Sequence, residues 1–115
     1  MNVTYDKNSK LLKLQITEEI DHHGAEKIRT RADFEIQKHI PKKLVIDFKK
    51  VNFMDSAGIG MVLGRYKMIS MFGGTMNIVN VNPAVKKVFE MSGITKIIPI
   101  IEETGGVENG SSVWE

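Results

Sequence analysis

The stretch that decides the fold reads Phe53-Met-Asp-Ser-Ala-Gly-Ile-Gly60. An apolar run at 44–48 precedes it, and an apolar pattern with helical spacing follows it from residue 61 onward. We interpret the stretch as a short loop after a buried strand, followed by the start of a helix. Asp55 and Ser56 suit the helix start, because their side-chain oxygens accept hydrogen bonds from N–H groups that have no partner within the helix.

Glycine near the start of this helix is not explained by capping alone. Gly58 and Gly60 each cost about 1 kcal/mol relative to Ala inside a helix. Glycine does allow another backbone to approach closely. We therefore interpret Ser56 as an exposed hydroxyl on a small, flat docking platform. The predicted contact surface comprises Asp55, Ser56, Ala57, Gly58, Ile59 and Gly60.

The composition limits the class of protein. A chain of 115 residues with 42% hydrophobic and 26% charged residues suits one globular domain. A net charge of +2 is too small to indicate nucleic-acid binding by itself. Without cysteine, disulfides and cysteine-based metal sites are excluded. We find neither a signal-peptide pattern nor an apolar run of about 20 residues, so we expect a cytoplasmic protein.

Hydrophobic periodicity predicts the element order β-β-α-β-α-β-α-β. Strands are expected at 3–7, 11–16, 44–48, 76–79 and within 94–101, and helices at 21–40, 56–71 and 83–92. The first two strands should form a hairpin, and the others should pair in parallel through right-handed crossovers. The prediction is a single α/β domain at 1–101, with a mixed sheet of about five strands and helices packed against it. The tail, 102–115, is expected to be a short helix or disordered.

The helix patterns also predict which side chains face the core. In the first helix these are Ala25, Ile28, Ala32 and Ile36. In the second helix they are Ile59, Val62, Leu63, Tyr66 and Ile69.

Catalytic and metal-binding patterns are weak. The position of Ser56 is similar to the nucleophile turn of α/β-hydrolases, but Met54 stands where the G-x-S-x-G pattern requires glycine. The general base would have to be His22, His23 or His39. His39 suits the C-terminal end of a helix, and the adjacent pair at 22 and 23 points in different directions, which suits one metal ion poorly. We expect neither an enzyme nor a bound metal or cofactor.

An acidic cluster of Glu18, Glu19 and Asp21 follows the second predicted strand. Asp21 is explained as a helix N-cap, which is worth about 1 kcal/mol. The cluster would equally serve as a docking point for an arginine of a partner protein. The residues alone leave both interpretations open. Met54 and Met61 leave a similar choice, between core filling and an adaptable contact surface beside the serine.

Four segments together resemble the STAS domains of anti-sigma factor antagonists. They are Glu19-Ile-Asp-His-His23, Phe53-Met-Asp-Ser-Ala-Gly-Ile-Gly60, Leu63-Gly-Arg-Tyr-Lys67 and Pro83-Ala-Val-Lys-Lys-Val-Phe-Glu-Met-Ser-Gly93. The resemblance covers 1–101 and is greatest to the sporulation members, which act on sigma F. Glu18 departs from the family pattern, because many relatives have glycine there.

The resemblance implies a regulator that is not an enzyme. Such proteins bind a kinase-type anti-sigma factor that holds ATP or ADP, and this frees the sigma factor. The kinase then phosphorylates the motif serine, here Ser56, which releases the antagonist, and a protein serine phosphatase restores it. Glu19 and Asp21 would meet an arginine of the partner. We expect a monomer when free, with no nucleic-acid or membrane partner. The alternatives are an antagonist for a stress-response sigma factor and a STAS domain that binds nucleotide or lipid.

Overall fold

A computed structural model describes residues 1–102 of the chain. Its elements in order are β1 (Asn2–Asp6), β2 (Leu11–Gln15), α1 (His22–His39), β3 (Lys43–Asp47), α2 (Ser56–Met71), β4 (Thr75–Val79), α3 (Pro83–Ser92), a 3₁₀ turn (Ile94–Lys96) and β5 (Ile100–Ile101). The predicted order of strands and helices is confirmed. The expectation of a short helix or disorder in the tail, including its Trp114, concerns residues outside the described range.

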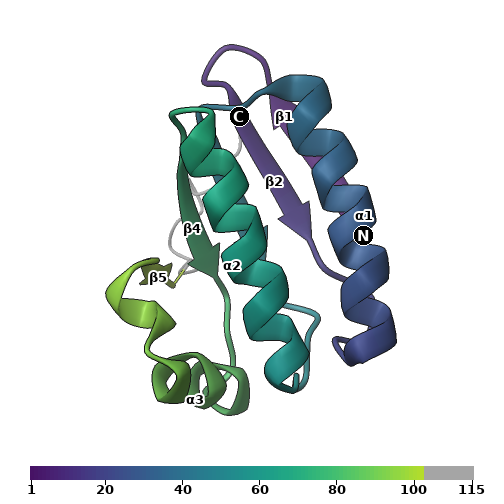
Figure 1. Cartoon of the computed structure of the whole chain (residues 1–115), viewed down its shortest axis with the longest axis vertical. Coiled ribbons are helices and arrows are strands. Elements are labelled where there is room, and N and C mark those ends of the chain that lie inside the picture. Colours follow the sequence, from purple (N-terminus) through teal and green to yellow (C-terminus); the bar gives the residue numbers. More distant parts are fainter. Residues whose placement is uncertain (103–115) are drawn as a thin grey trace.

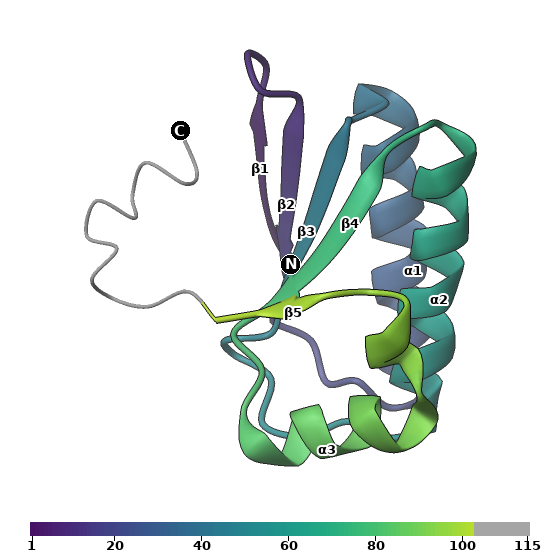
Figure 2. The ribbon, with the colours of Figure 1, turned by 90° about the vertical axis from the view of Figure 1, so that its left-hand side faces the viewer.

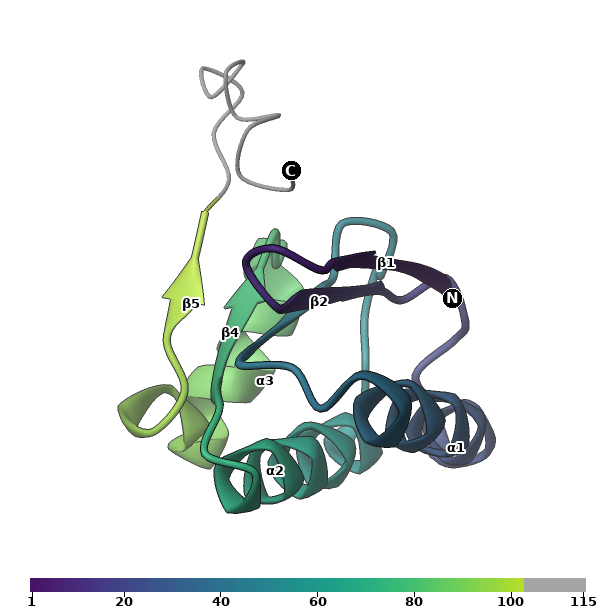
Figure 3. The ribbon, with the colours of Figure 1, turned by 90° about the horizontal axis from the view of Figure 1, so that it is seen from above.

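Within the described residues, five strands form one mixed sheet in the order β1-β2-β3-β4-β5. β1 and β2 are an antiparallel hairpin, and β2 to β5 run parallel. Each connection between parallel strands moves one strand further across the sheet, so right-handed crossovers place the connecting helices on the same side. Figures 2 and 3 show α1 and α2 side by side on one face, and α3 across the end of the sheet where the parallel strands finish. The N-termini of α1 and α2 lie at that same end (Figure 1).

The core lies between the sheet and these helices. Leu12, Leu14 and Ile16 alternate along β2 and just beyond it, and all three are buried, as a period of two residues predicts. The predicted inward face of α1 is confirmed, since Ala25, Ile28, Ala32 and Ile36 are all buried. Helix α3 closes the end of the core through Phe89, whose ring meets that of Phe48 edge-on with 5.3 Å between centroids.

The buried face of α2 differs from the prediction. Val62 and Ile69 are buried as expected. Ile59, Leu63 and Tyr66 are half-buried and pack against the core from its margin. Met61 and Arg65, which the pattern did not place in the core, are more fully buried. The physical reason is that α2 packs against α1 as well as against the sheet, which turns its buried face toward the neighbouring helix.

A buried ion pair joins the two helices. Nε of Arg65 lies 2.8 Å from Oδ1 of Asp33 in an orientation that makes no hydrogen bond, and Nη1 of Arg65 donates to the Met61 carbonyl at 3.3 Å. Burial lowers the pKa of Arg65, the Asp33 carboxylate raises it, and Arg29 lowers it, so that the pKa lies below its ordinary value. An arginine nevertheless stays protonated in proteins, so its charge has to be balanced inside the structure.

Loss of the Asp33 carboxylate should therefore destabilise the domain. In Asp33→Leu the guanidinium of Arg65 is buried without its counter-charge, and we expect the free energy of unfolding to fall by about 3 kcal/mol. This is the low end of the range for buried pairs, because Asp33 is partly exposed. The double variant Asp33→Leu/Arg65→Met should recover most of this loss, since it buries no charge. Urea unfolding followed by circular dichroism measures both. A double variant as unstable as the single one would show that the buried charge is not the cause.

Candidate functional site

The predicted site forms where the loop before α1 and the loop before α2 run side by side. Ile20 and Met54 form an isolated parallel bridge, and the N–H of Asp55 donates to the Ile20 carbonyl at 3.4 Å. The side chains of Ile20 and Met54 are both buried. The bridge places the segment 19–21 beside the segment 55–56, although the two are far apart in the sequence. The sequence pattern contained no signal for this contact.

Ser56 opens α2 with an exposed side chain. Asp55 is the N-cap, and its Oδ1 accepts from the Ala57 N–H at 2.9 Å. Ser56 is the first residue of the helix and is exposed, and its hydroxyl makes no hydrogen bond within residues 1–102. The capping carboxylate thus belongs to Asp55, which leaves the hydroxyl of Ser56 available at the positive end of the helix dipole.

The acidic cluster is held in place by the N-cap of α1 and by close backbone packing. Oδ1 of Asp21 accepts from the Gly24 N–H at 2.7 Å, so the predicted N-cap of α1 is confirmed. A Cβ atom at Gly24 would lie 1.7 Å from the Glu19 carbonyl oxygen, and only glycine fits there. The side chains of Glu19 and Asp21 are exposed. In the sequence, Gly24 is marked only as a glycine in the first turn after the cap, which does not reveal its contact with Glu19.

Glu18 has a different environment from Glu19. Its Oε2 accepts from the Met1 ammonium at 2.9 Å. Partial burial raises the pKa of Glu18, but hydrogen bonds from the Met1 ammonium and from the backbone N–H groups of Glu18 and Thr17 outweigh this, so the pKa lies below its ordinary value. Glu19 makes no ion pair within the described part of the chain. Of the two glutamates, Glu19 is the one whose carboxylate is available to a partner.

Some of the small and sulfur-containing residues near Ser56 pack in the core, and others lie on the surface. A Cβ atom at Gly58 would lie 2.6 Å from Sδ of Met54 and 2.9 Å from Cγ2 of Ile20, so close packing accounts for this glycine. A Cβ atom at Gly60 would have no neighbour within 4 Å. Met54 and Met61 are 5% and 4% exposed, so both fill the core and do not form a contact surface. Close packing therefore gives no reason for glycine at position 60.

Asn82 anchors the loop that leads to the serine. Its Nδ2 donates to the carbonyls of Val51 at 3.1 Å and Asn52 at 2.7 Å. Its Oδ1 accepts from the Val85 N–H at 2.8 Å and so caps α3. One side chain thereby links α3 to the β3–α2 loop. Sequence reasoning missed this role, because an N-cap asparagine carries no mark of a second, distant partner.

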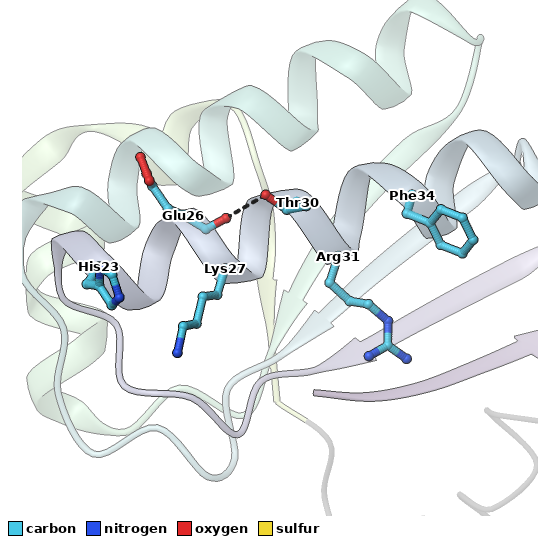
Figure 4. Close-up of a pocket in the computed structure, with 6 residues that line it drawn as sticks. All are labelled: His23, Glu26, Lys27, Thr30, Arg31 and Phe34. Atoms are coloured by element: carbon cyan, nitrogen blue, oxygen red, sulfur yellow. Dashed lines mark hydrogen bonds between the residues drawn. The ribbon is translucent and has the colours of Figure 1, made fainter.

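The hollows beside these residues are open surfaces. A groove of about 220 Å³ lies between the first turns of α1 and α2 and is lined by His22, Ala25, Glu26, Arg29, Ala57, Gly60 and Met61. A broader hollow of about 580 Å³ lies on the outer face of α1 and is lined by His23, Glu26, Lys27, Thr30, Arg31 and Phe34. Figure 4 shows that these six side chains all project from the one helix. Small-molecule sites enclose most of their ligand, so both hollows suit a protein surface better.

Two classes of site find no support within residues 1–102. No group of three His, Cys, Asp or Glu side chains is placed to hold a metal ion there. None of the helices in that range combines the length and the apolar character of a membrane span. At the far end of α1, His39 stacks on Tyr5, with 4.0 Å between ring centroids, and its Nε2 lies 3.4 Å from Oε1 of Glu35. The helix-end role predicted for His39 agrees with this position.

Two relatives with a similar sequence are anti-sigma factor antagonists. The model of the STAS domain matches residues 2–106. The chain is 36% identical over 102 residues to the anti-sigma F factor antagonist of Paenibacillus polymyxa, covering 89% of this chain and 87% of that one. It is 30% identical over 114 residues to the anti-sigma-B factor antagonist of Bacillus subtilis (strain 168), covering 94% of this chain and 98% of that one.

Solved structures agree with the sequence matches. The anti-sigma factor antagonist SpoIIAA in its unphosphorylated form has a TM-score of 0.77 and 26% identity, covering 97% of this chain and 96% of that one. The Bacillus cell fate determinant SpoIIAA in its phosphorylated form has a TM-score of 0.70 and 27% identity, covering 97% of each chain. Both states of that relative share the fold of this chain.

Gly58 and Gly60 in α2 should respond in opposite directions to alanine. Gly58→Ala forces a methyl group against Met54 and Ile20, and we expect a loss of about 1–3 kcal/mol from overpacking. Gly60→Ala meets open space in a helix and should raise the free energy of unfolding by up to about 1 kcal/mol. Parallel denaturant titrations compare the two variants with wild type. A stability gain in Gly58→Ala would contradict the packing described for the Ile20–Met54 bridge.

Proposed function

The chain belongs to the STAS-domain family of anti-sigma factor antagonists, and we propose that it controls a sigma factor by binding reversibly to a kinase-type anti-sigma factor. Antagonists of this family are regulators and not enzymes, in agreement with the expectation from the sequence. The observation that carries the proposal is the exposed Ser56 hydroxyl at the start of α2, with Glu19 and Asp21 beside it across the Ile20–Met54 bridge.

In the binding state the surface around Ser56 is neutral at its centre and acidic at its edge. The small side chains of Ser56, Ala57 and Gly60 allow a partner to approach the first turn of α2 closely. A kinase partner would transfer the γ-phosphoryl group of its ATP to Oγ of Ser56, which loses its proton, and ADP would remain on the partner. The position of the hydroxyl at a helix N-terminus favours the product, because the helix dipole and free N–H groups stabilise an anion.

Phosphorylation would then end the binding. The phosphate adds a charge of about −1.5 to −2 at neutral pH. Inside a complex it would lie next to the carboxylates of Asp55 and Asp21 and would lose its water. An uncompensated buried charge costs about 3–5 kcal/mol, which corresponds to more than a hundredfold in affinity. A protein serine phosphatase would remove the phosphate by hydrolysis and return the antagonist to its binding form.

Glu19 and Asp21 are the residues that we propose to recognise an arginine of the partner. Both are exposed at the edge of the surface that carries Ser56. Arginine pairs with carboxylates through two parallel charge-assisted hydrogen bonds, which gives both affinity and orientation. Asp55 contributes negative charge beside the serine while its Oδ1 is engaged in the cap of α2.

The sigma factor that we propose is sigma F of sporulation. This choice is supported by 36% identity to a sigma F pathway antagonist against 30% to a sigma B pathway antagonist. The alternative within the family is a stress-response sigma factor, supported by the nearly complete coverage of the sigma B relative. Binding assays that offer both anti-sigma factors to the chain at equal concentration distinguish the two by the affinity ratio.

We predict that Ser56 is the sole phosphorylation site. Incubation of the full chain with an anti-sigma F factor and ATP should add one phosphate, which mass spectrometry of peptides should locate at Ser56. Ser56→Ala should bind the partner but never be released by ATP. Ser56→Asp should bind more weakly than wild type, although less weakly than the phosphorylated protein, since one carboxylate carries less charge than phosphate. Phosphate on another hydroxyl would contradict the proposed site.

We predict that Asp21→Asn weakens partner binding without affecting stability. Asn and Ser cap helices about as well as Asp, so Asp21→Asn and Asp21→Ser should both keep the Tm of wild type. The lost charge-assisted pair is worth about 1.5–3 kcal/mol, or roughly 10- to 150-fold in Kd for the anti-sigma factor. Isothermal titration calorimetry and thermal unfolding measure the two effects. Unchanged affinity in both variants would leave Asp21 with only its capping role.

A further inference from the structure

Phe53 is the most exposed aromatic side chain within residues 1–102, with 66% of its surface accessible. It immediately precedes Met54, which is 5% exposed and forms the bridge to Ile20. Side chains alternate in direction along extended backbone, so Phe53 and Asp55 project outward while Met54 projects into the core. The ring therefore lies on the outer side of the loop, next to the start of α2.

Contacts on both sides of Phe53 fix the loop in a conformation that exposes the ring. On its N-terminal side, the Asn82 amide holds the carbonyls of Val51 and Asn52, and the Val51 N–H donates to the Phe48 carbonyl at 2.9 Å. On its C-terminal side, the Ile20–Met54 bridge fixes the next residue. Both neighbours of Phe53 are thus tied to the body of the domain.

The charges around Phe53 indicate the kind of partner surface that would cover the ring. The adjoining surface carries the carboxylates of Asp55, Glu19 and Asp21, so a complementary surface has an apolar pocket with basic side chains around it. Aromatic anchors that enter such pockets carry a large share of the affinity in protein interfaces. The continuity of Phe53 with the surface of Ser56 makes one partner cover both.

We infer that Phe53 is the apolar anchor of this interface, and that it inserts into an apolar pocket, rimmed by arginine or lysine, on the kinase-type anti-sigma factor. This inference rests on the proposed function and adds to it the residue that supplies binding energy. The carboxylates orient the partner, the ring holds it, and the hydroxyl of Ser56 receives the phosphoryl group. Charge on Ser56 then acts against an affinity that Phe53 largely provides.

Phe34 is a matched control within the same chain. It is 59% exposed, but it lies in the second half of α1 on the outer helix face, with Lys27 and Arg31 on the same face (Figure 4). The surroundings of Phe34 are mixed in charge, since Glu26 lines the same hollow and Arg31 pairs with Glu35, whereas carboxylates adjoin Phe53. Replacement of Phe34 by alanine removes a similar amount of exposed aromatic surface from a different face of the molecule.

The experiment measures the binding of the full chain to an ADP-loaded anti-sigma F factor by titration calorimetry. Phe53→Ala should raise Kd at least tenfold with an unchanged Tm, while Phe34→Ala should stay within twofold of wild type. With ATP, Phe53→Ala should raise KM for phosphorylation of Ser56 and change kcat little, because the ring binds but does not react. Phe53→Leu should retain part of the affinity.

Each other outcome contradicts the inference in a recognisable way. If wild type binds and Phe53→Ala binds equally well, the anchor is wrong and the proposed function stands. If wild type neither binds nor is phosphorylated by an anti-sigma F factor or an anti-sigma B factor, the proposed function fails and the inference fails with it. If sedimentation shows a wild-type dimer that Phe53→Ala dissociates, the ring is covered by a second copy of the chain and not by the kinase.

Discussion

The parallel bridge between Ile20 and Met54 is the contact on which the rest of the site depends. It holds the β2–α1 loop against the β3–α2 loop, and it thereby turns two separate helix starts into one surface. Two glycines make this possible, since Gly24 leaves room for the Glu19 carbonyl and Gly58 leaves room for the side chains of the bridge. The carboxylates of the first loop and the hydroxyl of the second become neighbours only through this packing. Asn82 completes the arrangement from α3.

A surface built in this way can be switched by charge alone. The caps of α1 and α2 are supplied by Asp21 and Asp55, so the Ser56 hydroxyl has no structural task within the described residues. A phosphate at that position is compatible with the helix dipole of the free protein and incompatible with an interface that already holds carboxylates. The solved relative has this fold in its unphosphorylated and its phosphorylated forms. The proposed regulation therefore requires a changed surface and no refolding.

Local signals in the sequence were sufficient for the elements and for the position of Ser56. Alternation at Leu12, Leu14 and Ile16 and the capping signals at Asp21 and Asp55 depend on neighbouring residues only, and the structure has the predicted elements. The features that the sequence did not predict depend on contacts between segments that are distant in the sequence. The buried face of α2 is turned by its contact with α1 and by the pair of Arg65 with Asp33. The contacts of Asn82 and the need for glycine at 24 depend on residues that the pattern could not place together.

The central claim is that phosphorylation changes the charge of one surface and leaves the fold intact. The most direct measurement compares the amide ¹H–¹⁵N spectra of the full chain before and after stoichiometric phosphorylation of Ser56. We expect shifts confined to 18–24 and 51–60, with the amides of β1, β5 and the C-terminal half of α1 unchanged and the Tm preserved. Shifts spread across the sheet, or a large change in Tm, would show that release of the partner involves a rearranged fold, and would contradict the account.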